Sequence, residues 1–275
     1  MILILGSKGM LGTELLQVFG NDAVGWDRAE CDVTNIVDLK SKISNLKPKT
    51  IINCVAYNDV DGAESHKDLA FKLNTEVPKN LAQVCLELNI ILVHFSSNYV
   101  FDGKYGEYDE LSVPNPISVY GQSKYQGEQE IQSVLEKYYL IRTSVLFGKQ
   151  GKSDLAKKSF VDIMLDLVSN QQEIKVVNDE VNSISYAKDV ALAVKVLLSQ
   201  SFRFGVYHLT NLGEASWFDF AKEIFKISKR DVLVVPISNT EFPRKAKRPA
   251  KAVLTNNKFI ALRPWQEALE EYLAN

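Results

Sequence analysis

The chain has 275 residues, of which 46% are hydrophobic and 24% are charged, and its formal net charge is −2. This length allows one large domain or two closely joined ones, and the composition is ordinary for a water-soluble globular protein. The near-neutral charge provides no field to attract nucleic acid or an anionic membrane, so we expect neither as a partner.

The cysteines and histidines argue against a disulfide framework and against a metal site. Cys31, Cys54 and Cys85 are far apart, and the three histidines are equally scattered. The chain lacks the ~20 consecutive apolar residues of a membrane helix, and its first apolar run is too short for a secretion signal. These features together predict a cytoplasmic protein with no bound metal.

The first predicted elements are a strand, a glycine-rich turn and a helix. Residues 2–5 form a short apolar run typical of a strand buried on both faces, and residues 13–19 have the apolar side of a helix. This order is the context of a dinucleotide fingerprint, in which glycines allow a tight turn and close approach to a pyrophosphate at the helix N-terminus. We therefore expect coenzyme contacts at Gly6, Ser7, Gly9, Met10, Leu11 and Gly12.

A second strand is predicted over residues 23–26, and it ends at Asp27 and Arg28. An acidic residue at this distance from the glycines binds the adenosine ribose and favours NAD, whereas an arginine accepts the 2′-phosphate of NADP. The two residues leave both coenzymes open. We expect Asp32 and Val33 to border the adenine.

Helices and strands alternate along the rest of the first half, with helices expected over residues 61–73 and 75–88, which predicts a parallel sheet covered on both faces. In the second half we expect a helix over residues 160–168 and a strand over residues 173–177. Ligands of such sheets bind beyond the carboxyl ends of the strands, where Asn53 and Ser97 are expected. We predict a Rossmann-type doubly wound parallel sheet in residues 1–148, with returning segments near 173–211. A smaller α/β substrate-binding region would comprise residues 149–172 and 212–275.

Tyr120 and Lys124 are four residues apart in a stretch compatible with a helix, so their side chains share one face. A fixed ammonium favours the phenolate, and on this basis Lys124 is expected to lower the pKa of Tyr120. Tyr120 is therefore a candidate general acid or base. The alternative is that Tyr120 and Lys124 lie on a solvent-exposed helix face and have no catalytic role.

Residues 243–251 contain five basic residues, two prolines and no acidic residue. The prolines disfavour a helix, and arginine offers two-pronged contacts to phosphate, so Arg244 and Arg248 are candidate ligands of a substrate diphosphate. A solvated charged loop is the alternative. A nucleic-acid site is disfavoured because the loop has no interleaved aromatic residues.

The glycine spacing, Ser97 and the Tyr120-x-x-x-Lys124 pair together resemble the extended short-chain dehydrogenase/reductases. The similarity is closer to the dTDP-4-dehydrorhamnose reductase family and runs over nearly the whole chain. It is carried by Ser-Ser-Asn-Tyr-Val-Phe-Asp-Gly at residues 96–103 and by residues 115–121, 141–144, 205–209 and 247–249.

The resemblance implies reduction of the 4-keto group of a dTDP-linked 6-deoxyhexose by NADPH or NADH, giving dTDP-L-rhamnose or a related sugar. It implies a catalytic triad of Ser97, Tyr120 and Lys124, a nicotinamide near Asn53 and Tyr120, and a further coenzyme contact at Ala56. Tyr120 would protonate the developing alkoxide and Lys124 would hold the nicotinamide ribose. Substrate contacts would fall on Asn58, Val60, Asn98 and Tyr99. Some relatives use Mg²⁺, which this sequence does not support, and a homodimer is a possible assembly.

Several positions depart from the family pattern and leave the exact sugar open. Ser97-Asn98 stands where the family usually has Thr-Asp, and Val145 stands where a tryptophan is common. A Gly-x-Pro-Thr-like segment is replaced by residues 182–185, and Ala252 replaces a serine.

Two other functions remain as alternatives. One is another enzyme acting on nucleotide sugars, such as an epimerase; a dehydratase is disfavoured because Asn98 and Tyr99 replace its acidic pair. The other is a non-catalytic NADP-binding subunit resembling the regulatory β subunit of methionine adenosyltransferase.

Overall fold

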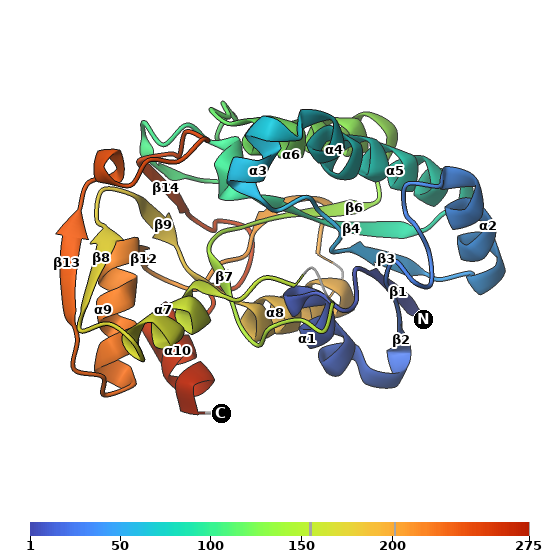
Figure 1. The fold of residues 1–275 in the computed structure, drawn as a ribbon. Coiled ribbons are helices and arrows are strands. Elements are labelled where there is room, and N and C mark those ends of the chain that lie inside the picture. Colours follow the sequence, from blue (N-terminus) through green and yellow to red (C-terminus); the bar gives the residue numbers. More distant parts are fainter. Residues whose placement is uncertain (154–155, 201, 275) are drawn as a thin grey trace.

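A six-stranded parallel sheet forms the centre of the larger part of the molecule, within the residues that this computed structural model describes, 1–153, 156–200 and 202–274 (Figure 1). The chain leaves β1 first toward β2 and then toward β3, so the direction of winding reverses beside β1. This arrangement confirms the predicted doubly wound sheet. In spatial order the strands are β11 (Gly205–His208), β6 (Tyr138–Thr143), β4 (Ile91–Ser97), β3 (Thr50–Asn53), β1 (Ile2–Leu5) and β2 (Ala23–Trp26).

Helices cover both faces of this sheet, as the continuous apolar strands require. On one face, α1 (Met10–Phe19) packs beside α8 (Ala187–Ser199), and their apolar side chains share one core with β1, β4 and β6. On the other face lie α2 (Ile36–Leu46), α5 (Val77–Leu88) and α6 (Val119–Val134), which bury Leu39, Leu81 and Ile131. Figure 1 shows α1 and α8 below the sheet and α5 and α6 above it.

The segment between β3 and α5 is a broken helix rather than the two regular helices expected over 61–73 and 75–88. It consists of α3 (Val60–Ser65), α4 (Lys67–Phe71) and a π-helical turn (Lys72–Glu76). Within that turn, the Asn74 amide donates to the Tyr57 carbonyl and the Ser123 hydroxyl, both at 3.0 Å. These bonds tie the turn to α6, and α3 is left beside the carboxyl end of the sheet.

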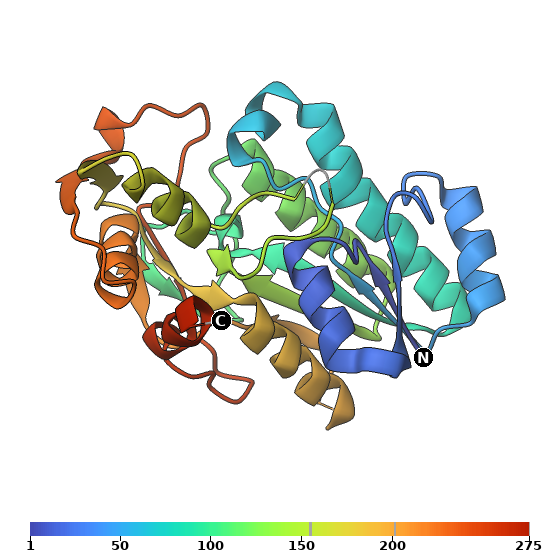
Figure 2. The same ribbon diagram turned by 60° about the horizontal axis from the view of Figure 1, so that its bottom comes forward.

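The C-terminal segments form a smaller part beside the large sheet (Figure 2). Its apolar core gathers Phe147, Phe220, Ile224, Trp265 and Leu269. Its helices are α7 (Phe160–Val168), α9 (Trp217–Ile227) and α10 (Trp265–Ala274). Its strands are β8 (Glu173–Val177), β9 (Val181–Ser183), β12 (Glu214–Ser216), β13 (Leu233–Ile237) and β14 (Lys251–Leu254), and β5 (Gly106–Tyr108) pairs with β14. Short connections are β7 (Leu146–Phe147), β10 (Ser185–Tyr186) and the 3₁₀ turns at Gly20–Asp22, Asn98–Val100 and Asn239–Glu241.

The strand pairing refines the expected division into two regions. The predicted strand at residues 173–177 pairs with β13 in the smaller part, whereas β11 joins the main sheet through β6. We therefore propose that the returning segment comprises α8 and β11, within the range near 173–211 expected from sequence. Among the helices of the described residues, none is both long and apolar enough to cross a membrane.

Candidate active site

The glycine turn between β1 and α1 has the shape that its sequence predicts. Gly6 has φ +73°, in the left-handed region that side chains disfavour, and a Cβ on Gly12 would lie 2.3 Å from the Gly6 carbonyl oxygen. The helix begins at Met10, three residues earlier than expected, so Met10, Leu11 and Gly12 form its first turn. No side chain of the described chain caps that turn, and its backbone N–H groups suit a phosphate.

The turn opens onto a cavity of about 360 Å³ at the carboxyl ends of β1 and β2. Six residues predicted from sequence lie on its wall: Gly6, Asp27, Arg28, Asp32, Val33 and Ala56. Thr34 and Lys72 also line it, and sequence analysis did not single them out. Backbone and side-chain hydrogen bonds from Thr34 keep the pKa of Asp32 below its usual value, so this carboxylate is ionised and fixed. A cavity beside a glycine turn, with apolar walls and a few charged side chains, fits the adenosine half of a dinucleotide.

Helix α6 is placed so that its first turn presses against the residues after β4. Ser118 caps the helix by accepting from the Gly121 N–H at 3.2 Å, and the Glu64 carboxylate accepts from the Val119 N–H at 2.9 Å. A Cβ on Gly121 would lie 2.2 Å from the Tyr99 carbonyl oxygen, so only glycine permits this approach. As a result the Tyr99 and Tyr120 rings meet edge to face, with centroids 5.6 Å apart.

The structure brings Ser97 and Tyr120 together at the end of β4. Their hydroxyls are hydrogen-bonded to each other, and the Ser97 hydroxyl also accepts from the Tyr99 N–H at 3.2 Å. Lys124 lies one turn further along α6, where its side chain is almost fully buried, and its ammonium donates to the Phe95 carbonyl at 2.6 Å. Three polar groups from two elements therefore surround one end of the sheet.

The expected effect of Lys124 on Tyr120 is wrong for this structure. Burial raises the pKa of Tyr120 above its ordinary value, and the hydrogen bond with Ser97 opposes that shift. Burial also lowers the pKa of Lys124 to about 8, while the nearby Glu128 carboxylate acts in the opposite direction. The sequence spacing did not reveal that the ammonium is bonded to a backbone carbonyl of β4. Tyr120 is consequently held as a neutral phenol at neutral pH, the form that donates a proton.

Two asparagines predicted as site residues have structural hydrogen bonds. Asn53 is fully buried and bonds the His94 ring and the Val55 N–H, each at 3.1 Å. Asn98 is buried too, and its amide donates to the Asn182 side chain at 2.8 Å and to the Ala252 carbonyl at 3.1 Å. Asn98 thus joins the end of β4 to β9 and β14, and a substrate contact from it stays a prediction.

The predicted substrate residues between β3 and α3 lie at the edge of the site. Asn58 is exposed and Val60 is half-buried at the first position of α3. Tyr99 is half-buried, in edge contact with Tyr120. Direct contact of these three residues with a ligand stays a prediction.

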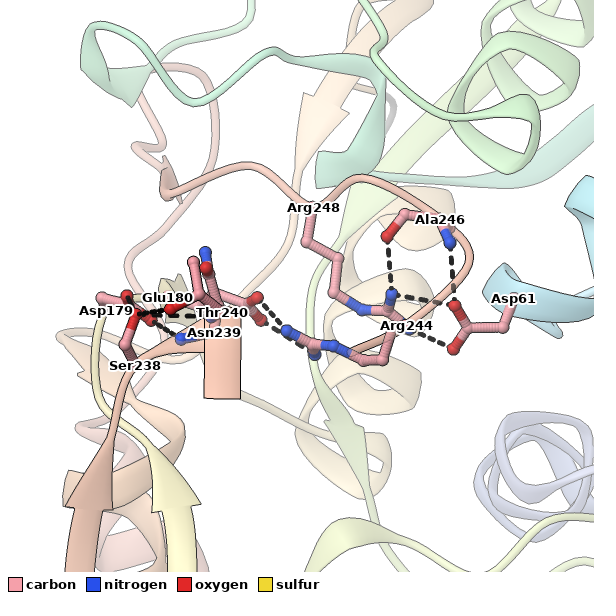
Figure 3. A network of polar contacts seen from close by, with 9 residues as sticks. All are labelled: Asp61, Asp179, Glu180, Ser238, Asn239, Thr240, Arg244, Ala246 and Arg248. Atoms are coloured by element: carbon pink, nitrogen blue, oxygen red, sulfur yellow. Dashed lines mark hydrogen bonds and ion pairs between the residues drawn. The ribbon is translucent and has the colours of Figure 1, made fainter. Parts of the chain in front are cut away.

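The basic loop is held by ion pairs, which rules out a freely solvated loop for its two arginines (Figure 3). Arg244 forms a two-pronged pair with Glu180, just before β9, in which one bond measures 3.2 Å. Arg248 forms another with Asp61 of α3, at 2.7 and 3.1 Å. Sequence analysis missed both carboxylates because they are 64 and 187 positions away from their partners.

A doubly wound parallel sheet, a glycine turn before its first helix, and Ser, Tyr and Lys at the end of β4 define a Rossmann-type short-chain dehydrogenase/reductase. The family model described as RmlD substrate binding domain matches residues 1–275. A dTDP-4-dehydrorhamnose reductase from Aggregatibacter actinomycetemcomitans is 34% identical, over 99% of this chain and 98% of that protein. The chain therefore belongs to the dTDP-4-dehydrorhamnose reductase family.

Two further relatives agree with this assignment. The spore coat polysaccharide biosynthesis protein SpsK of Bacillus subtilis is 32% identical over 99% of this chain and 96% of its own length. A solved dTDP-4-dehydrorhamnose reductase from Bacillus anthracis, in complex with NADP, is 35% identical with a TM-score of 0.94. That structure covers 99% of this chain, and this chain covers 98% of it.

Proposed function

We propose that this protein reduces the 4-keto group of a dTDP-linked 6-deoxyhexose with NADPH, giving dTDP-L-rhamnose or a related sugar. The names of its full-length relatives support the reaction, and the NADP complex of the Bacillus anthracis relative supports the coenzyme. The observation that carries the proposal is the hydrogen-bonded pair of Ser97 and Tyr120, with Lys124 one turn away at the same end of the sheet.

The chain's own groups have complementary roles in this reaction. When bound, NADPH supplies the hydride that adds to the carbonyl carbon. Tyr120, neutral at physiological pH, donates its proton to the carbonyl oxygen, and the Ser97 hydroxyl donates a hydrogen bond to the same oxygen as charge develops there. The resulting product is an alcohol, and Tyr120 recovers a proton from solvent before the next turnover.

The residues that would hold NADPH are spread along the carboxyl end of the sheet. The α1 N-terminus would hold the pyrophosphate, and Arg28 and Lys72 would provide cations for the 2′-phosphate. An ammonium has three N–H donors, so Lys124 has donors for the ribose hydroxyls besides the one on Phe95. The Asp27 carboxylate on the same cavity wall leaves NADH as a second, weaker coenzyme.

The alternatives to reduction are less well supported. The reductase names of several relatives favour turnover over a regulatory role like that of the methionine adenosyltransferase β subunit.

The three cysteines, all within the described residues, are free thiols, and this supports the proposal that the protein works in the reducing cytoplasm.

A coenzyme oxidation assay with dTDP- and UDP-linked 4-keto-6-deoxyhexoses tests the proposal. We expect one NADPH to be consumed per dTDP-linked sugar reduced, with slower turnover for NADH or for the UDP-linked sugar. Conversion of the sugar without net NADPH consumption would instead indicate an epimerase. No conversion of any sugar, together with a stable complex with a synthetase, would indicate the regulatory subunit.

A further inference from the structure

The Asp61 carboxylate lies in a cradle of N–H donors formed by the basic loop. Its two oxygens accept from both terminal nitrogens of Arg248, at 3.1 and 2.7 Å, and from the Ala246 N–H at 3.0 Å. A second bond, from Arg248 Nη1 to the Ala246 carbonyl at 3.0 Å, fixes the guanidinium against the loop backbone (Figure 3). Convergent guanidinium and backbone donors are the usual ligands of a phosphate group.

The cradle is next to the second arginine and close to the proposed catalytic tyrosine. The charges of both Arg244 and Arg248 act on Asp61 and on Tyr99, and the ring of Tyr99 contacts the ring of Tyr120. Two cations therefore lie side by side with a carboxylate at each end, Glu180 and Asp61. The cluster has no net charge, although the loop itself is strongly basic.

The two carboxylates differ in how easily they could give up their arginine. The Glu180 side chain is only 2% exposed, and breaking its pair would leave a buried charge, which is strongly unfavourable. The Asp61 side chain is 36% exposed on the short helix α3, where water can solvate it once it turns away. An incoming dianion would consequently displace Asp61 and leave the Arg244–Glu180 pair intact.

We propose that Asp61 is an internal competitor of the substrate, occupying in the free protein the cradle of Arg248 and Ala246 that receives the diphosphate of the nucleotide sugar. The diphosphate carries more negative charge than one carboxylate. When Asp61 leaves, the diphosphate accepts hydrogen bonds from Arg248 and from the Ala246 N–H. Arg244, held by Glu180, is the fixed cation beside it. This inference rests on the proposed function, because it takes a nucleotide diphosphate as the ligand.

The opposite role for Asp61 is that it positions the loop for binding, and the two roles predict opposite effects of neutralising it. If Asp61 competes, Asp61→Asn removes the charge that holds Arg248, and dTDP binds roughly three- to fivefold more tightly, which is the upper part of the range expected for a partly exposed ion pair. If Asp61 positions the loop, the same change weakens binding.

The experiment is calorimetric titration of dTDP into the full-length protein saturated with NADP. Asp59→Asn is the matched control, since Asp59 precedes α3 and pairs instead with Lys157, so it tests for a general effect of removing one negative charge. We expect Asp59→Asn to leave the dissociation constant within about twofold of wild type. Weaker or unchanged binding by Asp61→Asn, or equal tightening by Asp59→Asn, would overturn the inference.

A double-mutant cycle tests the same idea through the cradle itself. In an Arg248→Met background, dTDP should bind more weakly and Asp61→Asn should no longer improve its affinity, because the two changes act on one pair. Tightening that persists without Arg248 would contradict the proposed exchange. Since dTDP has no keto group, these measurements do not depend on turnover, and failure of the proposed reduction would show separately in the coenzyme oxidation assay.

Discussion

The glycine turn and the basic loop are both proposed to bind phosphate, yet they are built in different ways. The turn is shaped by neighbours in sequence, since Gly6 and Gly12 contact each other directly between β1 and α1. The basic loop is shaped by partners far away in sequence, Glu180 and Asp61. The turn is therefore preset by backbone geometry, whereas the loop depends on side-chain charges that a ligand can compete for.

Loss of the proposed proton donor, Tyr120, should have the largest effect. We expect Tyr120→Phe to lower kcat by about 10²- to 10⁴-fold, because it removes the proposed acid. The NADPH dissociation constant should stay near that of wild type. Tyr105→Phe is the matched control, since Tyr105 is largely exposed. Turnover close to wild type in Tyr120→Phe would remove this residue from the mechanism.

The preset character of the glycine turn predicts a smaller but clear loss in Gly12→Ala. The added Cβ would lie 2.3 Å from the Gly6 carbonyl oxygen, and moving this backbone should cost about 3 kcal/mol of stability and weaken NADPH binding. Gly20→Ala is the control: Gly20 has φ +53° but no atom within 4 Å of the added Cβ. Its cost of about 1–3 kcal/mol comes from backbone strain alone and should be visible in urea unfolding, without a change in coenzyme affinity.

Removing the carboxylate charge from each of the two ion pairs of the basic loop should lower the free energy of unfolding of the protein by different amounts. Glu180→Gln leaves Arg244 facing a neutral group in a nearly buried position, and we expect a loss of about 2 kcal/mol. Asp61→Asn should cost less than about 1 kcal/mol, because the pair is partly exposed. Urea unfolding of both variants measures the difference. A larger loss of stability in Asp61→Asn would show that the Arg248–Asp61 pair, and not the Arg244–Glu180 pair, is the fixed one.

The smallest expected effect is the loss of stability at acid pH when Asp61 becomes protonated. The hydrogen bond from Arg248, assisted by that from the Ala246 N–H, lowers the pKa of Asp61 to about 2, against an unfolded value of about 3.9. A lowered folded-state pKa stabilises the protein above pH ~4, and this contribution is lost as the pH falls toward ~2. The stability difference between wild type and Asp61→Asn should therefore shrink over that interval. A difference that is constant with pH would contradict the assigned pair.

The sequence predicted the elements whose residues are neighbours in the chain. The strand, glycine turn and first helix were expected, and the helix at Phe160–Val168 and the strand at Glu173–Val177 were predicted with the observed bounds. The strands of the four-stranded sheet, including β14, were missed. They are only three or four residues long, too short for a clear apolar period, and they pair with segments far away in sequence.

The site was predictable to the same extent. Sequence patterns indicated Ser97, Tyr120, Lys124 and six residues on the wall of the cavity beside the glycine turn, and the structure brings Ser97 and Tyr120 into hydrogen-bond contact. Asp61, Glu180 and Lys72 were missed because no local spacing links them to their neighbours in the fold. The predicted direction of the pKa shift of Tyr120 was wrong because residue spacing does not show burial, and burial is the main cause of the shift.

We propose that Tyr120 stays a neutral phenol until it gives its proton to the substrate. Its ionisation can be measured directly as the difference in tyrosinate absorbance between wild type and Tyr120→Phe during an alkaline titration. We expect this difference to appear only above pH ~10, because burial raises the pKa of the phenol. A difference that appears between pH ~6 and ~8 would show a phenolate in the resting enzyme, and Tyr120 could then not be the neutral proton donor.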